Sequence, residues 1–318
     1  MDSATDDPVL NYQEIFYTGW NKEVLFAKNL DRYNHYLKCA DPIGLGGYSI
    51  INPTQDLVDA YEMEDGQSPI IGYKENGTPI INYSSNYQEE GYAENEFPGR
   101  WEKGVHNMYT HREPRFYASI NYPGQIWKSH RLEFWYSGVD GKRYAGSDYC
   151  KTGYLMRKIV DSSFRVIENI NPMTNWIYFR LAEQYLNYAE ALNEYSGPSN
   201  EVYKYIDAIR NRVGLPGLIK GLTKEEMRNR IKHERRIELA FETHRFFDVR
   251  RWKDAENSEN KTIHALNIME GDHMQDDRFY KRVILENRIF EAPKHYFFPI
   301  AQNEIDKNVK NLIQNPGW

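Results

Sequence analysis

The chain has 318 residues, of which 40% are hydrophobic and 27% are charged, and its formal net charge is −6. This length is enough to bury a core and allows one large domain or two smaller ones. The sequence contains no basic stripe that could neutralise phosphates and no apolar run of about 18 residues, so neither a nucleic-acid partner nor a membrane-spanning helix is expected. The N-terminus lacks a basic start and an apolar core, which excludes a signal peptide there.

The cysteine count and the aromatic content exclude fewer functions than the charge and the hydropathy do. Cys39 and Cys150 are too few for a disulfide framework and are not spaced as metal ligands, so we predict no metal and no cofactor. The aromatic fraction is 14%, with 25 Tyr and 7 Trp. Tyr and Trp suit wet interfaces and ligand platforms, although many tyrosines in irregular loops are simply half-buried. Composition alone leaves both interpretations open.

The first hundred residues predict two helices and a long irregular segment. A loosely periodic helix is expected over Asn21–Lys38, and a short amphipathic helix over Thr54–Glu62, with Thr54 as its N-cap. Residues 64–110 show no regular period and are rich in Gly, Asn, Pro, Tyr and Glu. A structureless stretch this long is usually functional or disordered, and its aromatic residues argue against disorder.

Three short strands are expected next, over Arg115–Tyr122, Leu132–Tyr136 and, more weakly, Lys151–Lys158. Pro123-Gly124 ends the first, and a turn at Asp140-Gly141 follows the second. The fold class expected for the whole chain is mostly α, with a long loop-rich region and a few short strands.

The second half predicts helices clearly. Apolar spacing indicates helices over Tyr178–Glu194 and Glu201–Arg212, joined by a short connection into an antiparallel helix pair of the TPR type. One helical repeat cannot bury its own face. We therefore expect this pair to be only partly covered within the chain, which in turn predicts missing N-terminal sequence, either because the chain is an expressed fragment or because its reading frame is truncated.

A third helix is expected to run without interruption from Thr223 to about Trp252. It opens with Thr223-Lys-Glu-Glu226, which is a capping box.

The search for catalytic motifs finds none that is complete. His233-Glu234 begins like a zinc-protease helix, but Ile237 stands where the second histidine is required. The third helix carries the acidic residues Glu234, Glu238, Glu242 and Asp248. Two of them could in principle act as the carboxylate pair of a glycoside hydrolase. Their spacing suits ion pairs better, and the expected partners are Arg235, Arg245 and Arg251. Glu113 and Arg115 are expected to stabilise a loop through an ion pair.

Several segments, in order from about residue 50 to 318, resemble the SusD/RagB family. They are NPTQDLVDAYEMEDG (52–66), REPRFYASINYPG (112–124), WIYFRLAEQYLNYAEALNE (176–194), IRNRVGLPG (209–217), ERRIELAFETHRFFDVRRW (234–252) and HYFFPIAQNEIDKNVKNLIQNPGW (295–318). Glu113, Thr243 and Val249 depart conservatively from the residues that the family usually has. The resemblance implies that residues 1–318 are the C-terminal portion of such a protein, with a loop-rich ligand-binding region at 1–175 and a helical region at 176–318.

The resemblance also implies a function. It predicts a non-enzymatic protein on the outer face of a bacterial outer membrane, attached only through a lipid anchor missing from this chain. Such a protein captures oligosaccharide and delivers it to a SusC-like TonB-dependent transporter. Two alternatives remain, a glycoside hydrolase and a helical scaffold that binds peptides.

The expected ligand site lies in the 64–110 segment, because sugars need aromatic faces for their C–H patches and polar groups for their hydroxyls. The residues that supply this mixture are Tyr73, Tyr83, Asn86, Tyr87 and Trp101. Trp127 and Trp135, beside the predicted strands, are the second choice. The alternative for Trp101 is that it packs as core.

Overall fold

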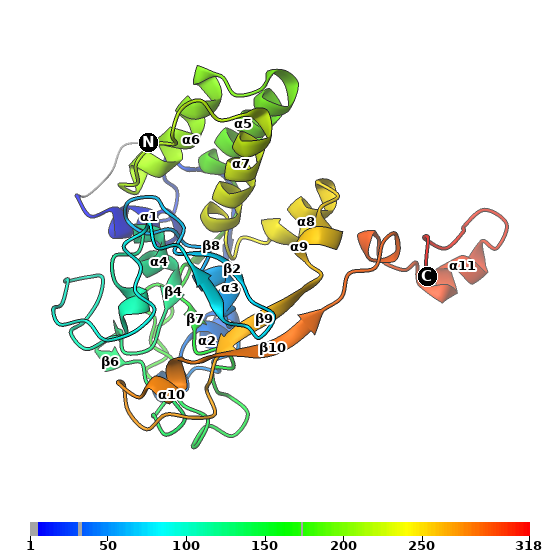
Figure 1. Cartoon of the computed structure of the whole chain (residues 1–318). Coiled ribbons are helices and arrows are strands. Elements are labelled where there is room, and N and C mark those ends of the chain that lie inside the picture. Colours follow the sequence, from blue (N-terminus) through cyan, green and yellow to red (C-terminus); the bar gives the residue numbers. More distant parts are fainter. Residues whose placement is uncertain (1–5, 31–33, 173) are drawn as a thin grey trace.

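The computed structural model describes residues 6–30, 34–172 and 174–318 (Figure 1). Helices account for more of these residues than strands do, as the sequence predicts. The helices are α1 (Pro8–Tyr17), α2 (Asn34–Ala40), α3 (Gln55–Val58), α4 (Pro114–Ser119), α5 (Leu181–Ser196), α6 (Asn200–Arg212), α7 (Lys224–Glu238), α8 (His244–Arg251), α9 (Ala255–Ser258), α10 (Asp277–Tyr280) and α11 (Gln302–Lys307).

The strands pair only in twos. In the described residues they form five antiparallel ribbons, β1 (Val24–Leu30) with β8 (Thr174–Arg180), β2 (Ile70–Tyr73) with β3 (Pro79–Ile81), β4 (Ile120–Asn121) with β7 (Leu155–Met156), β5 (Ile126–Trp127) with β6 (His130–Arg131), and β9 (Lys261–Leu266) with β10 (Arg282–Arg288). Figure 1 shows α5, α6 and α7 together at the top of the view and the β9–β10 ribbon below them, with α10 lower still.

Helices α5, α6 and α7 share one hydrophobic core. Its buried side chains include Ala182, Leu186, Ala189, Val202, Ile206, Ile209, Met227 and Ile231. The Ser199 side chain caps α6, and Thr223 and Glu226 form the predicted capping box at the start of α7. The helix pair is therefore confirmed, but the expectation that its apolar face is only partly covered is wrong, because α7 packs against it.

The predicted single helix from Thr223 to Trp252 is also wrong, because it breaks between α7 and α8. Phe241 and Thr243 take positive φ values of 64° and 68° at the break. The buried ammonium of Lys158 donates to the carbonyl oxygens of Glu238, at 2.8 Å, and Ala240, at 2.9 Å. These carbonyls therefore satisfy a buried cation instead of continuing the helical hydrogen-bond pattern.

The first half of the chain differs more from the expected elements. Where a helix was expected over residues 21–38, the chain forms β1 and then α2, and residues 31–33 lie outside the described residues. The strand expected over residues 115–122 is mostly helix α4, because Pro114 occupies the first helical turn, where its missing N–H costs nothing. Residues 132–136 form no regular strand, and only Leu155–Met156 of 151–158 does.

Residues 54–62 contain the short helix α3, and Thr54 caps it as predicted: its hydroxyl accepts from the backbone N–H of Leu57. The 64–110 segment is ordered by the β2–β3 hairpin and by isolated bridges, such as that between Tyr92 and His106. The domain boundary proposed between residues 175 and 176 falls inside β8; the division into two regions stays a prediction.

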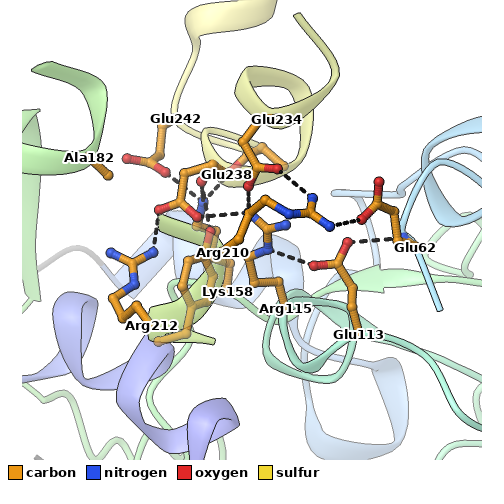
Figure 2. Close-up of polar contacts among 12 residues, drawn as sticks. Glu62, Glu113, Arg115, Lys158, Ala182, Arg210, Arg212, Glu234, Glu238 and Glu242 are labelled. Atoms are coloured by element: carbon orange, nitrogen blue, oxygen red, sulfur yellow. Dashed lines mark hydrogen bonds and ion pairs between the residues drawn. The ribbon is translucent and has the colours of Figure 1, made fainter. Parts of the chain in front are cut away.

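A network of buried ion pairs joins α7 to the rest of the molecule (Figure 2). Arg115 on α4 contacts three carboxylates: its Nε lies 2.6 Å from Glu113, and its Nη1 contacts Glu234 and lies 3.1 Å from Glu238. Arg210 on α6 joins Glu234, at 3.0 Å, to Glu62, at 2.9 Å. All of these side chains are almost completely buried.

The second part of the network surrounds Glu238. Arg180, at the end of β8, contacts Glu238 at 2.7 Å and Glu242 at 2.6 Å, and Arg212 contacts Glu238 at 2.5 Å. Burial alone raises the pKa of Glu238, but Arg212, Arg180 and Arg115 outweigh it and hold that pKa well below its ordinary value. The predicted ion pairs form, but the expected partners are confirmed only for Asp248, which pairs with Arg235 and Arg251, each at 2.9 Å. The partners predicted for the three glutamates are wrong, because cations from other elements take those places, and Arg245 pairs with Glu259.

Arg115→Met tests the network. The substitution leaves Glu113, Glu234 and Glu238 buried with fewer cations, so we expect the free energy of unfolding to fall by about 3–5 kcal/mol in urea titrations. Arg228→Met is the matched control: Arg228 pairs with Glu194 at 2.6 Å, but both side chains are more than a third exposed, and its loss should cost less than about 1 kcal/mol. Similar losses in the two variants would contradict a central role for Arg115.

Candidate functional site

A groove of about 550 Å³ lies where the tip of the β2–β3 hairpin meets the loop before Tyr92 and the turn from α10 into β10. Its lining residues are Asn76, Gly77, Thr78, Pro79, Glu89, Glu90, Gly91, Tyr92, His106, Asp277, Tyr280, Lys281 and Arg282. Gly77 turns the hairpin with a φ of 81°, a conformation that favours glycine. A Cβ there would lie 3.4 Å from His264, so the hairpin tip packs closely on β9.

One wall of the groove is aromatic. The His106 ring stacks on Tyr280 with the ring centroids 4.3 Å apart, and Tyr92 meets both rings edge-on. The Tyr92 hydroxyl donates to Asp277 at 2.5 Å. His106 and Tyr280 are buried, whereas Tyr92 is partly exposed. Tyr92 therefore supplies the aromatic surface that a ligand could contact.

The other wall is built around Arg282. This buried side chain pairs with Asp59 at 2.9 Å and with Glu89, and it donates to the Tyr87 hydroxyl at 3.1 Å. Tyr87 in turn donates to Glu89 at 2.6 Å. These groups form ion pairs and hydrogen bonds with one another, so their role is to fix the shape of the groove. The exposed side chains of Asn76, Glu90, Asp277 and Lys281 at its rim offer the polar atoms.

The structure brings only some of the predicted site residues to this region. Tyr87 lies behind the groove, and Tyr73, at the end of β2, donates to Asp59 in the same hydrogen-bonded cluster. Tyr83 is 89% exposed, and Asn86 is also exposed on the same loop. Tyr92 is not among the contacts predicted from the sequence, and neither are His106, Asp277, Tyr280 and Arg282.

The three predicted tryptophans are buried. Trp101 is 8% exposed, Trp127 3% and Trp135 4%. The Trp101 indole packs among Phe97, His111 and Tyr117. The Trp127 indole N–H donates to Asp41 at 3.2 Å. Their ring faces are covered by protein, which is the core alternative considered for Trp101.

The carboxylates of α7 offer no accessible acid pair. Glu234 and Glu238 are almost completely buried, and each is held by at least two guanidinium groups. Because a glycan cannot reach these two buried carboxylates, they are not placed to hydrolyse one. Within residues 6–30, 34–172 and 174–318, no group of three or more His, Cys, Asp or Glu side chains is placed to hold a metal ion, and no helix is long and apolar enough to cross a bilayer.

Trp101→Ala separates a core role from a platform role. Because the indole is buried among aromatic rings, we expect the free energy of unfolding to fall by about 3–5 kcal/mol in chemical denaturation. Trp20→Ala, which removes an indole that is 67% exposed, should change it by about 0.5 kcal/mol or less. A Trp101→Ala variant as stable as the Trp20→Ala variant would return Trp101 to the list of ligand contacts.

The buried His106 predicts a pH dependence. Burial lowers the pKa of His106 to about 4, against an ordinary value of 6.5. The unfolded chain therefore binds a proton more readily, so stability is fully present above pH 6.5 and falls as the pH drops toward 4. The contribution lost is at most about 3 kcal/mol. Urea titrations between pH 7 and 4 should show this loss of stability in the native chain and a smaller loss in His106→Gln. If the free energy of unfolding changed equally with pH in both, His106 would not be the cause.

Comparison with known proteins agrees with the fold. The SusD family model matches residues 15–318. SusD-like protein P2 of Formosa agariphila is 32% identical over 152 residues, which are 46% of this chain and 26% of that protein. A SusD-like protein from Bacteroides fragilis has a TM-score of 0.75 at 28% identity, covering 100% of this chain and 59% of its own. A SusD-like carbohydrate-binding protein from the same species has a TM-score of 0.69 at 26% identity, covering 94% and 56%.

The chain thus spans little more than half the length of these two solved relatives and about a quarter of P2. The family match nevertheless covers almost every residue of the chain, and it confirms the resemblance carried by the sequence segments from residue 52 to 318. The chain belongs to the SusD family.

Proposed function

We propose that this chain binds an oligosaccharide in the groove between the β2–β3 hairpin and the α10–β10 turn. The observation that carries the proposal is a groove of about 550 Å³ in which a partly exposed Tyr92 ring stands beside exposed polar side chains. Family membership supports it, as does the solved carbohydrate-binding relative from Bacteroides fragilis.

The groove has the chemistry that a sugar ring needs. A pyranose presents flat C–H patches, which pack on an aromatic face, and hydroxyls, which must find hydrogen-bond partners when they leave water. Tyr92 offers the aromatic face. Asn76, Glu90 and Asp277 offer acceptors, and Asn76 and Lys281 offer donors. A few convergent polar groups in a concave aromatic site are typical of small-ligand binding.

The loop that leads into the groove extends the proposed site. Tyr83 and Asn86 are exposed on it and are free to contact a longer glycan. Tyr73 and Tyr87 act behind it, because their hydroxyls hold Asp59 and Glu89 in place around Arg282. Trp101, Trp127 and Trp135 are left out of the proposed site because protein covers their rings.

We extend this proposal to the whole protein. A SusD-family member that captures glycan on the outer face of the outer membrane, held there by a lipid anchor, would pass the glycan to a SusC-like TonB-dependent transporter. Bound oligosaccharide and transporter are the partners that this function requires. Loss of uptake, with surface binding retained, after deletion of the partner transporter would support the delivery step.

Tyr92→Ala tests the groove. A glycan array with the native chain identifies a binding oligosaccharide, and calorimetry with that oligosaccharide then measures affinity. Loss of the aromatic contact should weaken binding by about 2 kcal/mol, roughly thirtyfold, as for other aromatic anchors. Tyr195→Ala is the matched control, since Tyr195 is 89% exposed on α5, outside the groove, and it should leave affinity unchanged. Undiminished affinity of a folded Tyr92→Ala variant would exclude the groove.

The same oligosaccharide distinguishes binding from hydrolysis. Incubation with the native chain should release no reducing sugar, and chromatography should recover the ligand intact. Release that persists in an independently purified sample would favour the hydrolase alternative. An array without any glycan hit would favour the peptide scaffold.

A further inference from the structure

A second, smaller cavity of about 140 Å³ lies along β2. It shares no lining residue with the groove described above, which meets the tip of the hairpin. The cavity is lined by Asp56, Asp59, Ala60, Ile70, Gly72, Tyr73, Arg236 and Lys261. Two acidic and two basic side chains therefore face one space, and their pairing decides what that space can hold.

The two acidic side chains are already satisfied. The Asp59 carboxylate accepts from Arg282 at 2.9 Å and from Gln55 at 2.8 Å, and the Tyr73 hydroxyl also donates to it. Asp56 accepts from the backbone N–H of His264 at 2.7 Å and contacts the His264 ring nitrogen at 3.3 Å. Neither carboxylate forms an ion pair with Arg236 or Lys261.

Among the described residues, neither basic side chain forms an ion pair, although the Asp56 and Glu259 carboxylates favour the charged forms of both from beyond ion-pair distance. Arg236 donates to the backbone carbonyl oxygen of Asp56 at 2.9 Å, which is an uncharged partner. In the part of the chain that the structure describes, no hydrogen bond or ion pair joins the Lys261 ammonium. Burial, with Arg236 as the next cause, lowers the pKa of Lys261 to about 8. Both side chains are partly buried. Holding the two cations close together there is unfavourable, and an anion between them would relieve that cost.

Neighbouring acidic groups offset the two cations only in part. Asp56 bonds to His264 and forms no ion pair with either cation, and the Glu259 carboxylate pairs with Arg245 at 3.1 Å. The Tyr73 side chain also lines the cavity, and its ring stacks on His264 with the centroids 4.0 Å apart. The cavity is therefore a small space lined by two cations, two carboxylates and an aromatic ring, and its volume of about 140 Å³ suits a charged substituent better than a whole oligosaccharide.

We propose that Arg236 and Lys261 bind one anionic group, a carboxylate or a sulfate, carried by an acidic sugar of the glycan. The planar guanidinium can donate two parallel hydrogen bonds to either group, and the ammonium adds a point charge. The proposal rests on the glycan-binding function and names its substrate class: the protein selects acidic over neutral glycans at this cavity.

Matched ligand pairs test the selection. Oligogalacturonides and the same oligomers with their carboxyls reduced differ only in charge, and sulfated galactan oligosaccharides and their desulfated forms separate sulfate from carboxylate. Calorimetry with the native chain should show preference for the charged member of at least one pair. Lys261→Met should weaken its binding about tenfold or more and leave neutral glycans unaffected. Lys261→Arg should restore most of the affinity.

Lys74→Met is the matched control. Lys74 is exposed and directly follows Tyr73 at the end of β2, outside the cavity lining. Lys74→Met removes the same charge from the same hairpin. If the effect of Lys261→Met is local, Lys74→Met should change affinity for the acidic ligand by less than about twofold. Equal losses in Lys74→Met and Lys261→Met would show general charge attraction and overturn the site.

Sodium sulfate alone separates this proposal from the glycan-binding function. In the native chain with isotope-labelled methylated lysines, sulfate should shift the Lys261 resonance saturably and raise the pKa of Lys261, because a bound anion favours the charged amine. Sulfate binding without any glycan binding would retain the anion site but reject the proposed function. Neutral-glycan binding that Lys261→Met leaves unchanged, with no response to sulfate, would reject the anion site and retain the function.

Discussion

The structure depends on the pairing of Glu238 with three arginines from three different elements. Arg115 comes from α4, Arg180 from the end of β8 and Arg212 from the end of α6, so one carboxylate at the end of α7 holds four segments together (Figure 2). A buried charge is stable only where its partners are in place. The network therefore favours one arrangement of these segments over others in which an ion would remain buried without a partner.

The short helix α3 connects this network to the candidate site. Asp56 and Asp59, from α3 and its C-cap, hold His264 of β9 and Arg282 of β10. On its other side, Glu62 follows α3 and pairs with Arg210. A four-residue helix thus couples the ion network, the β9–β10 ribbon and the β2–β3 hairpin. The groove and the cavity both lie against this ribbon and hairpin, so their shape depends on contacts made far from any ligand.

The aromatic residues divide between core and surface in a way that composition cannot resolve. Tyr109, Phe116, Tyr122 and Tyr154 pack on one another in the main core. The hydroxyls of the three tyrosines are used internally; that of Tyr154, for example, donates to Gln55 at 2.7 Å. These buried rings stabilise loops that have little regular hydrogen bonding, whereas other aromatic residues, including Tyr83 and Tyr92, are fully or partly exposed.

The sequence by itself determined the family, through matching segments along much of the chain. It also determined the helical class, the α5–α6 pair and the caps at Thr54 and Thr223, because capping and apolar periodicity act within a few residues. The sequence also indicated the irregular 64–110 segment, residues of which line the candidate groove. Only the tertiary structure decided where α7 ends, since Lys158 takes its last carbonyls, and which aromatics are exposed. It also decided that Tyr92 meets Asp277 and Tyr73 meets Asp59. Contacts between residues far apart in the chain depend on the packing of whole elements, and no local pattern records them.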